Sequence, residues 1–492
     1  MSSGPPEDAS EVAPQAPRRP VPHAPIGLAK LSPSRLSDGA LFALVTAVVF
    51  VTRLPFLGNG YGIDADAWRL VRAGQQLAQT GDYHTSRLPG YPIPEVSLAV
   101  LYHGGPWLTN GVSALLSGVA VAFFALVMRH LGNPYATLAA VGLALAPVVY
   151  VASVQTMDYM WALAFAMASV YTLTRDRPLL AGILLGLAAG CRVTSLVLLL
   201  PFLAYVLWPP RPPGLSRFLV KLIAASLGTF LAAYAVVLVT LRGNVLPDLA
   251  PVHRTALATA IRGTFDVWGV LGLLAIGGAL VATIAVAIVR GRRAAYDARG
   301  YGKVIAMCTV ALVTYAAVYL RAPLDASYLI PALPFALLLL ARIPRPAFTV
   351  VCAALIVSPF VFTLTDVAAG PRTQRSVIVR GRIFIDRNRR LGAMRTIHQI
   401  ESACSDMHQP SVLVAGWYKP WLDVLDGGRV GQCTVVLSVT PEELAGYQTD
   451  GVGVWVVPKV KDYVEHMTGV DLDPPAAQPL DVTPAPADDA GQ

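Results

Sequence analysis

Two aspartates, Asp64 and Asp66, directly follow the first long apolar run of the chain, and their types and spacing point to chemistry. When two carboxylates lie close together, the charge of one raises the pKa of the other. A general base needs such a shift to work near neutral pH. A structural role is the alternative, because either aspartate could cap an amphipathic helix predicted over 67–79. Capping accounts for one aspartate, but not for both.

Other charged residues lie at the ends of apolar runs. Asp158 precedes the run 159–174, where an unpaired carboxylate is costly and marks a candidate site, although a helix cap is the simpler interpretation. Three arginines lie near the ends of runs, where a planar guanidinium suits bidentate phosphate binding: Arg87, Arg192 and Arg321. Snorkelling at the membrane surface is the alternative for each, and Arg321 could also pair with Asp325.

The composition identifies a membrane protein. Of 492 residues, 55% are hydrophobic and 14% are charged, whereas soluble domains carry about 25% charged residues. A single span would be diluted in a chain of this length, so the mean hydropathy of +0.56 requires many spans. A soluble enzyme, a disordered scaffold and a nucleic-acid-binding domain are excluded, and the net charge of +8 reflects membrane topology.

About eleven apolar runs have a spanning length or nearly so. They are 39–56, 111–128, 134–153, 159–174, 178–191, 194–208, 219–241, 266–289, 304–320, 328–341 and 347–366. If the N-terminus is cytoplasmic, the clusters of Lys and Arg between these runs all fall on the cytoplasmic side, as the positive-inside rule requires. The outer side then holds the first loop, 57–110, and everything after 367.

The predicted fold class is an α-helical polytopic membrane protein with a small C-terminal α/β domain outside the cytoplasm. In this organisation, 1–38 is a disordered cytoplasmic segment, 39–371 is the transmembrane domain, 372–472 is the α/β domain and 473–492 is a disordered tail rich in Pro, Ala and Asp. Within the α/β domain, Cys404 and Cys433 are candidates for a disulfide.

The order of several motifs resembles the GT-C integral-membrane glycosyltransferases, which include the protein mannosyltransferases and the aminoarabinose transferases. In the first outer loop, the acidic pair precedes a helical stretch, a Gly-Asp-Tyr turn at 81–83 and the run Ser86–Pro92. The segments Gln155–Asp158, Gly190–Ser195 and Arg321–Pro331 follow on the same side. The resemblance covers about 40–366. Many members carry adjacent Asp-Glu, whereas Ala65 separates the two aspartates here, which leaves the roles of Asp64 and Asp66 unordered.

The resemblance implies a hexosyl or pentosyl transferase that moves sugar from a polyprenyl-phosphate carrier to a glycan, protein or lipid acceptor. It implies catalysis by Asp64, Asp66 and Asp158, donor-phosphate binding by Arg87, Arg192 and Arg321, and acceptor or sugar contacts by Glu95, Tyr91 and Tyr328. The protein is expected to be a multi-pass protein of the inner membrane of the cell envelope. The richness in Pro, Ala and Arg suggests a bacterial source.

No cofactor or metal site is expected. No two histidines have ligand spacing, and isolated carboxylates would hold Mg²⁺ or Mn²⁺ only weakly. The competing hypothesis is a multi-span transporter or flippase of a lipid-linked or small-molecule substrate. A transporter places ionisable groups near the middle of the membrane, and mid-span charges are scarce here apart from Arg192.

Overall fold

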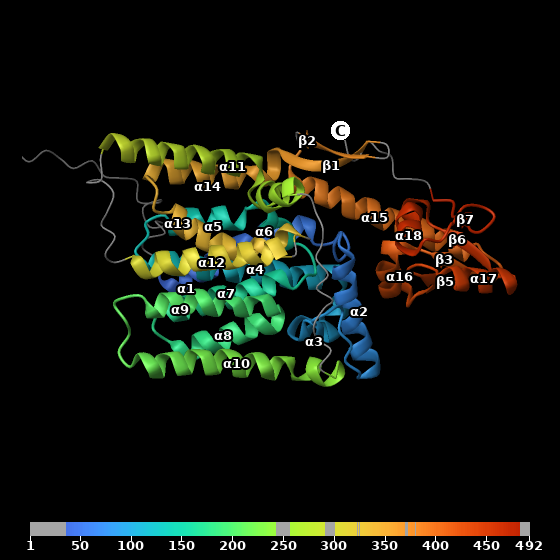
Figure 1. Ribbon diagram of the computed structural model, residues 1–492, viewed down its shortest axis with the longest axis horizontal. Coiled ribbons are helices and arrows are strands. Elements are labelled where there is room, and N and C mark those ends of the chain that lie inside the picture. Colours follow the sequence, from blue (N-terminus) through green and yellow to red (C-terminus); the bar gives the residue numbers. More distant parts are fainter. Residues whose placement is uncertain are drawn as a thin grey trace, which may run out of the picture.

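The computed structural model describes residues 36–482 except 243–255, 291–300, 322, 324, 370, 371 and 379. Nearly all of the predicted N-terminal segment, the basic residues of 291–300 and the end of the predicted tail therefore lie outside the described residues. The described chain is an α-helical polytopic membrane protein, in which a long helical bundle carries a small α/β domain at one end (Figure 1).

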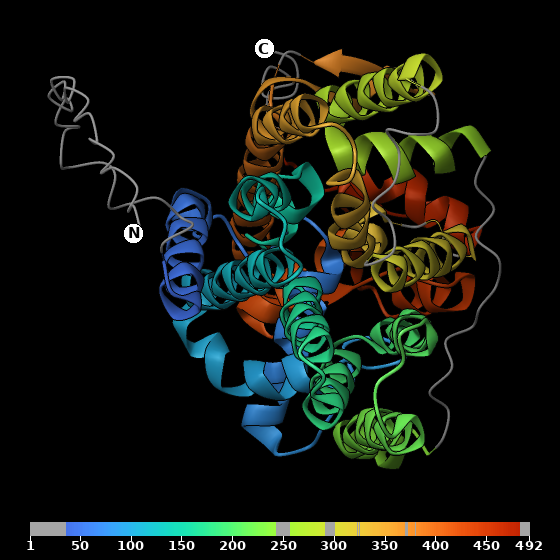
Figure 2. The ribbon, with the colours of Figure 1, turned by 90° about the vertical axis from the view of Figure 1, so that its left-hand side faces the viewer.

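Each predicted apolar run lies largely in helix. The bundle contains α1 (Asp38–Arg53), α4 (Gly105–His130), α5 (Ala136–Ala144), α6 (Pro147–Ala152), α7 (Tyr159–Thr174), α8 (Pro178–Cys191), α9 (Leu199–Leu207), α10 (Leu215–Thr240), α11 (Ala256–Arg290), α12 (Gly302–Arg321), α13 (Leu333–Leu340) and α14 (Arg345–Val361). Short 3-10 helices, η3 (Leu54–Phe56), η5 (Val193–Leu198) and η8 (Ala326–Ala332), extend α1, α9 and α13. In the view along the bundle, α11 and α14 lie on one side and α10 on the other (Figure 2).

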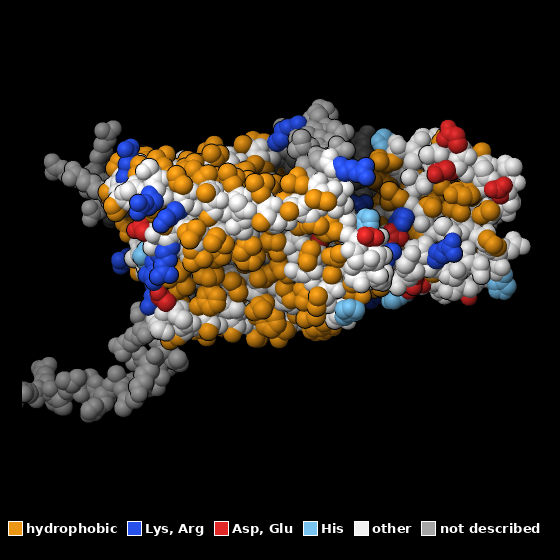
Figure 3. Space-filling view, turned by 90° about the horizontal axis from the view of Figure 1, so that it is seen from below, with side chains coloured by type: hydrophobic (Ala, Val, Ile, Leu, Met, Phe, Trp, Pro, Cys, Tyr) orange, Lys and Arg blue, Asp and Glu red, His pale blue; other side chains and the backbone are white. Residues whose placement is uncertain are grey.

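Five helical segments of the described chain are long and apolar enough to cross a membrane. They are Asp38–Phe56, Pro92–His130, Leu215–Thr240, Thr259–Val286 and Gly302–Arg321. Hydrophobic side chains cover the bundle between the α/β domain and an opposite end where Lys and Arg gather (Figure 3). At that opposite end, Arg129 and Arg175 lie 3.4 and 4.0 Å from Asp38.

One predicted span is interrupted, because Pro147 cannot continue the hydrogen-bond ladder of α5 and instead begins α6. The buried Arg53 from the end of α1 fills the interruption. Its guanidinium donates to the Ala144 carbonyl and, over 3.2 Å, to Ser153 Oγ, and it lies 4.2 Å from the centre of the Tyr150 ring. Arg53 therefore supplies a donor to a carbonyl at the break, where Pro147 has no backbone N–H to offer.

The first outer loop contains two helices, α2 (Ala65–Thr80) and α3 (Pro92–Leu101), and a 3-10 turn, η4 (Tyr102–Gly104). Asp64 caps α2, since its Oδ1 accepts from the Asp66 amide over 2.9 Å. Gly81 ends α2 with φ of +77°, a left-handed conformation that glycine adopts without steric cost. The predicted helix over 67–79 is thus present, with the predicted cap.

After α14, a hairpin pairs β1 (Thr363–Ala369) antiparallel with β2 (Arg372–Ile378). The long helix α15 (Arg382–Ser405) then leads to a five-stranded sheet of order β4-β5-β3-β6-β7. The strands are β3 (Ser411–Val414), β4 (Arg429–Val430), β5 (Cys433–Val436), β6 (Gly453–Val456) and β7 (Gln478–Pro479). Only β4 among them is antiparallel to its neighbour.

Three helices complete the α/β domain: α16 (Lys419–Asp426), α17 (Pro441–Thr449) and α18 (Lys461–Thr468), with short 3-10 turns η9 (Gly416–Tyr418) and η10 (Pro458–Val460). The strands predicted near 411, 433 and 453 are present. The predicted disordered tail differs, because Ala477 and Leu480 are buried and β7 pairs with β6. Order therefore continues to at least residue 482.

The α/β domain packs against the first outer loop. The Trp68 ring of α2 stacks on the Trp421 ring of α16 with a centroid separation of 4.3 Å and an interplanar angle of 19°. Gln75 of α2 donates to the Val424 carbonyl over 3.2 Å. Both tryptophans are buried, so the domain is fixed to the loop that carries the acidic pair.

Candidate functional site

Asp64 lies at the wall of a cavity of about 250 Å³ between the first outer loop, the bundle and α15. The cavity is lined by Ile63, Asp64, Val148, Val151, Ala152, Gln155, Met157, Tyr159, Arg262, Asp266, Asp325, Ser327, Thr363, Arg382, Ile385, Asp386 and Arg389. Asp64 remains exposed to solvent. Its carboxylate can therefore meet a molecule that enters the cavity.

The surroundings of Asp64 favour its protonated form. Although the Asp64 side chain reaches solvent, the protein around its carboxyl group displaces part of the water and thereby raises its pKa, and the neighbouring charge of Asp66 raises it further. Asp325 acts in the same direction, whereas the amide of Asp66 and the guanidinium of Arg87 oppose the shift. A carboxylate whose pKa is raised is a stronger proton acceptor than an ordinary aspartate.

Asp66 has different surroundings, since it forms two ion pairs. Arg69 Nη1 lies 3.0 Å from Asp66 Oδ1, and Arg87 Nε lies 3.2 Å from Asp66 Oδ2. Asp66 is not among the residues that line the cavity. The two aspartates, whose roles the sequence left unordered, thus have different surroundings in the structure.

Asp158 is fully buried between two arginines. Arg87 Nη2 lies 2.6 Å from its Oδ1, and Arg192 Nη1 lies 2.5 Å from its Oδ2. Asp158 occupies the N-cap position of α7, but its side chain makes no capping hydrogen bond in the described chain. Its carboxylate is therefore engaged by guanidinium groups and not by the backbone of the helix.

Aromatic rings enclose the two arginines. The Arg87 guanidinium lies 3.9 Å from the centre of the Tyr91 ring, and Arg192 lies 4.3 and 4.8 Å from the ring centres of Tyr159 and Tyr328. Such contacts stabilise a buried cation. The structure brings together predicted site residues from four distant segments: Asp66, Arg87, Tyr91, Asp158, Arg192 and Tyr328.

Glu95 is buried inside the first outer loop and serves as a hydrogen-bond acceptor there. It accepts from the Ser86 amide and hydroxyl over 2.7 and 2.6 Å, from the Tyr91 amide over 3.0 Å, and from the Tyr83 hydroxyl. These bonds fold the segment that carries Arg87. Glu95 thus organises the loop from within.

Arg321 ends α12 with an exposed side chain and is not among the residues that line the cavity. Asp325 accepts from the Ser327 amide over 3.0 Å, which caps η8, and from the Tyr159 hydroxyl over 3.3 Å. Asp325 also lines the cavity, and these two hydrogen bonds hold it in the wall.

The buried Asn110 of α4 fixes the start of the first outer loop. Its side-chain amide donates to the Leu57 and Gly60 carbonyls over 2.7 and 2.9 Å, and its oxygen accepts from the Thr156 hydroxyl over 2.7 Å. The Thr156 amide donates to the Tyr61 carbonyl over 2.7 Å. These hydrogen bonds hold the segment that carries Asp64 beside the segment that carries Asp158.

Sequence reasoning missed the far wall of the cavity, which is formed by α11 and α15. Arg262 and Asp266 come from α11, and Arg382, Asp386 and Arg389 come from α15. Arg382 lies 2.5 Å from Asp266. The concentration of arginines over 380–390 was the available signal, because a basic run after the last span is unexpected on the outer side.

The helix α15 is joined to the bundle through buried polar contacts. Asp386 accepts from Gln155 over 2.9 Å and lies 3.0 Å from Arg390. The fully buried Arg390 also donates to the Val154 and Phe56 carbonyls over 3.0 and 3.2 Å. Burial raises the pKa of Asp386, and the neighbouring arginines oppose that shift.

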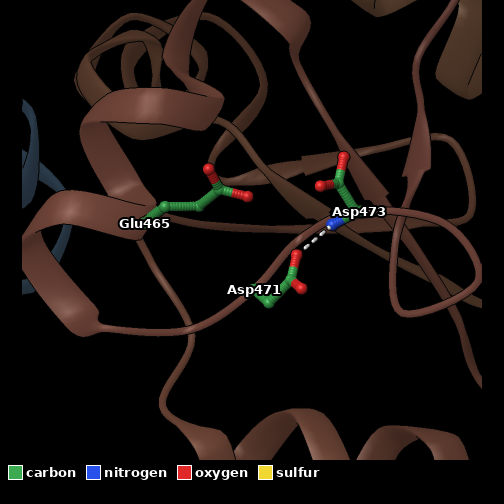
Figure 4. A group of neighbouring side chains, drawn as sticks. All are labelled: Glu465, Asp471 and Asp473. Carbon is green, nitrogen blue, oxygen red and sulfur yellow. Dashed lines mark hydrogen bonds between the residues drawn. The ribbon is translucent and has the colours of Figure 1, made fainter.

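A separate group of carboxylates, Glu465, Asp471 and Asp473, lies at the surface of the α/β domain (Figure 4). Lys461 occupies this group, since its Nζ lies 3.6 Å from Glu465 Oε1 and contacts Asp473. Glu465 also accepts from the Leu472 amide over 2.9 Å. These contacts stabilise the turn after α18 and give the group a structural role.

Cys404 and Cys433, the candidates for a disulfide, are both buried free thiols. The Cys433 thiol donates to Met407 Sδ over 3.3 Å. The neighbouring Cys433 side chain and burial raise the pKa of Cys404. The two residues are neighbours, as the sequence interpretation required, without the covalent bond.

No family model matches the chain, and no curated protein matches it. Among solved structures, the chain is similar to the Archaeoglobus fulgidus oligosaccharyltransferase tethered to an acceptor peptide that contains an NVT sequon. The TM-score is 0.40 and the sequence identity is 12%. The similarity covers 81% of this chain and 63% of the archaeal chain.

Proposed function

We propose that this protein is a membrane glycosyltransferase of the GT-C type, which moves a hexosyl or pentosyl group from a polyprenyl-phosphate carrier to a glycan, protein or lipid acceptor. One observation carries the proposal: Asp64 presents an exposed carboxylate with a raised pKa to a cavity that also contains arginines. Such a site offers a base for the acceptor and cations for a phosphate leaving group.

In the proposed step, the carboxylate of Asp64 takes the proton of an acceptor hydroxyl or amine. The acceptor atom forms a bond to the anomeric carbon as the bond from that carbon to the phosphate oxygen breaks. The electron pair stays on the phosphate, which leaves as a polyprenyl phosphate with one more negative charge. Positive groups near that oxygen stabilise the transition state, because they act where the charge develops.

Asp66 and Asp158 are proposed as positioning residues. Each lies between two arginines, and both share Arg87. The ion pairs link the first outer loop to the start of α7 and to the break after α8. Loss of either carboxylate would move the loop that presents Asp64.

The proposed location is the inner membrane of a bacterial cell envelope, with a cytoplasmic N-terminus and an extracytoplasmic α/β domain. The basic end of the bundle, opposite the α/β domain, supports this orientation through the positive-inside rule (Figure 3). The cavity lies on the side of the α/β domain, since it is lined by Asp64, the N-cap of the helix α2 that packs against this domain, and by residues of α15, which leads into it. Donor and acceptor would therefore meet at the outer surface.

The proposed transfer needs no tightly held metal. In the described chain, the carboxylates that line the cavity do not include three whose ligand atoms lie within 4.8 Å of one another. A divalent cation bound there would be held weakly. We expect transfer to continue in excess EDTA, and a complete loss that Mg²⁺ or Mn²⁺ restores would contradict this part of the proposal.

The deciding experiment measures transfer of radiolabelled sugar from a panel of polyprenyl-phosphate sugars by the purified protein. The wild type is compared with Asp64→Asn, Asp66→Asn and Asp158→Asn, each checked for monodispersity and thermal stability. We expect transfer by the wild type and its loss in Asp64→Asn with unchanged stability. Transfer by Asp64→Asn at the wild-type rate would refute the role of Asp64, and inactivity of the wild type with every donor would favour a transporter.

A further inference from the structure

A second cavity lies between the first outer loop and the α/β domain. Helices α2 and α16 form its two main walls, and it has a volume of about 280 Å³. It shares none of its described lining residues with the cavity that contains Asp64. The stacked rings of Trp68 and Trp421 hold the two helices together. The proposed glycosyl transfer leaves this cavity, the α2–α16 pocket, without a role.

Charged side chains line both walls of the pocket. Arg69, Arg72 and Gln76 lie three and four positions apart along α2, so they share one face of that helix. Lys419 and Asp423 line the pocket from α16. The lining thus contains three cations and one carboxylate among its described residues.

Among the described residues of the pocket, Arg72 is the cation that has no carboxylate partner. Lys419 Nζ lies 2.7 and 2.6 Å from the two oxygens of Asp423, and Arg69 Nη1 lies 3.0 Å from Asp66 Oδ1. Arg72 makes no hydrogen bond or ion pair within the described chain, although its side chain is half-buried. The pocket therefore keeps an uncompensated positive charge.

Neutral polar groups line the pocket together with Arg72. The side chains of Gln76 and Thr85 are half-buried and make no hydrogen bond within the described chain. The Ser86 hydroxyl donates to Glu95 over 2.6 Å, so its oxygen can still accept a hydrogen bond. The pocket thus offers donors and acceptors beside its charge.

We propose that the α2–α16 pocket binds a sugar that carries a carboxylate or a phosphate. The guanidinium of Arg72 binds the anionic group through paired hydrogen bonds, and charge-assisted bonds of this kind are strong. Gln76, Thr85 and Ser86 hydrogen-bond to the sugar hydroxyls. The volume corresponds to roughly nine water molecules, which is room for one sugar ring with its charged group.

The position of the pocket favours a water-soluble ligand over a lipid headgroup. Helix α2 lies between the apolar bundle and α16 (Figure 1). The pocket between α2 and α16 is therefore on the side of α2 that faces away from the helices long and apolar enough to cross a membrane. The ligand enters it from water.

A bound sugar would touch both the first outer loop and the α/β domain. On the loop side, Ser86 is followed by Arg87, which pairs with Asp66 and Asp158. Occupancy of the pocket therefore fixes the segment that positions this arginine. The pocket is an accessory site, separate from the cavity of the proposed transfer, and it does not depend on that proposal.

The test measures binding of galacturonate and galactose 6-phosphate to the full-length protein in nanodiscs of zwitterionic lipid, by saturation-transfer difference NMR. Galactose has a similar ring without a charge and reports the contribution of the hydroxyls. The variants are Arg72→Gln and Thr85→Val. Arg429→Gln is the matched control, since Arg429 is exposed, does not line the pocket and makes no ion pair within the described chain.

We expect the wild type to bind at least one charged sugar roughly tenfold more tightly than galactose, as one hydrogen-bonded charge provides. Arg72→Gln should lose that preference, whereas Arg429→Gln should keep it. Arg72→Gln should also unfold at the wild-type temperature, because its side chain has no partner to lose within the described chain. Thr85→Val should weaken the binding of all three sugars.

The preference between the two charged sugars identifies the anionic group as a carboxylate or a phosphate. Equal binding of charged and neutral sugars by the wild type would overturn the inference, and so would an unchanged preference in Arg72→Gln. Nanodiscs that contain phosphatidylglycerol test the lipid alternative. Competition by this lipid that disappears in Arg72→Gln would refute a soluble ligand.

The same preparations separate this inference from the proposed function. Asp64→Asn should bind the charged sugars as the wild type does, because Asp64 lines the other cavity. Binding that depends on Arg72 in a protein that transfers no sugar would support the accessory site and refute the transferase. Transfer by a wild type whose sugar binding does not depend on Arg72 would do the reverse.

Discussion

Arg192 lies 2.5 Å from Asp158, and this ion pair is almost completely buried where the bundle meets its first outer loop. The remaining oxygen of Asp158 is bound by Arg87, so one carboxylate joins the start of α7, the break after α8 and the first outer loop. Buried charges persist only when they are paired. The arrangement thus depends on all three residues.

Asp158→Asn should destabilise the protein strongly. It leaves two buried guanidinium groups without their counter-charge, and breaking a buried pair costs about 3–5 kcal/mol. Thermal unfolding in detergent would measure the loss. The double variant Asp158→Asn/Arg192→Gln should recover part of the stability, because it removes one of the stranded charges. A single variant as stable as the wild type would show that the ion pairs do not hold the loop.

The rate of transfer should rise with pH through the pKa of Asp64, because a base acts only when it is deprotonated. That pKa lies above the ordinary value for an aspartate, owing to burial and to the charge of Asp66. In Asp66→Asn the acid limb should move to lower pH, since a negative neighbour is removed. Initial rates between pH 4 and pH 7 would test this. Asp82→Asn, an exposed aspartate after α2, should leave the acid limb in place, and a shift in that control would contradict the assignment.

Gly269→Ala should disturb the wall of the cavity that α11 forms. Gly269 divides α11 with φ of +71° and ψ of 167°, a region that only glycine adopts at low cost. A Cβ there would lie 1.9 Å from Ser358 Oγ. The strain of about 1–3 kcal/mol should displace the segment that carries Arg262 and lower the midpoint of thermal unfolding. Gly277→Ala is the control, because nothing lies within 4 Å of its added Cβ. Equal effects of both changes would refute this explanation.

Trp421→Ala should loosen the α/β domain from the first outer loop. It removes the stacked partner of Trp68 and leaves a cavity, a change that costs about 3–5 kcal/mol in a packed core. Hydrogen exchange in α2 should accelerate. Trp417→Ala removes a tryptophan that is 39% exposed, so it should leave exchange in α2 unaltered. Unchanged protection in Trp421→Ala would mean that other contacts fix the domain.

The thiols of Cys404 and Cys433 should resist a bulky maleimide in the native protein and react after denaturation. Both are buried and free, and burial protects a thiol from reagents of that size. Mass spectrometry counts the added groups, with the reaction run without reductant. A denatured protein in which neither thiol reacts until it is reduced would show that they form a disulfide.

The helical architecture could be predicted from the sequence, because apolar runs and the charges between them are local signals. A cap of α2 at either Asp64 or Asp66 and the break at Arg192 are likewise local; the break is present, and the cap is at Asp64. The sequence did not predict the strand β7. Ala477 and Leu480 lie in a Pro-rich segment, and their burial depends on pairing with the distant strand β6. Composition alone does not reveal such a partner.

The roles of Asp64 and Asp66 could not be separated by counting positions. They differ because the cap at Asp64 turns one carboxylate to the cavity, while Arg87, brought in by the fold of the Glu95 segment, binds the other. Arg262, Arg382 and Arg389 escaped notice because nothing in the local sequence connects α11 and α15 with the first loop. The packing of α15 makes that connection, through Arg390, through the bond between Gln155 and Asp386, and through the pair of Arg382 and Asp266.

The hydrogen bonds from Arg390 to the carbonyls of Phe56 and Val154 can form only late in biosynthesis. More than 300 residues separate Asp64 from Arg390, so the ribosome needs roughly 15 to 60 s to deliver α15 after the first loop has emerged. Until then the growing chain holds Asp64 without Arg382 and Arg389, the arginines that α15 contributes to the cavity. The nascent protein would therefore remain inactive in the membrane until α15 has been synthesised and has packed against the bundle.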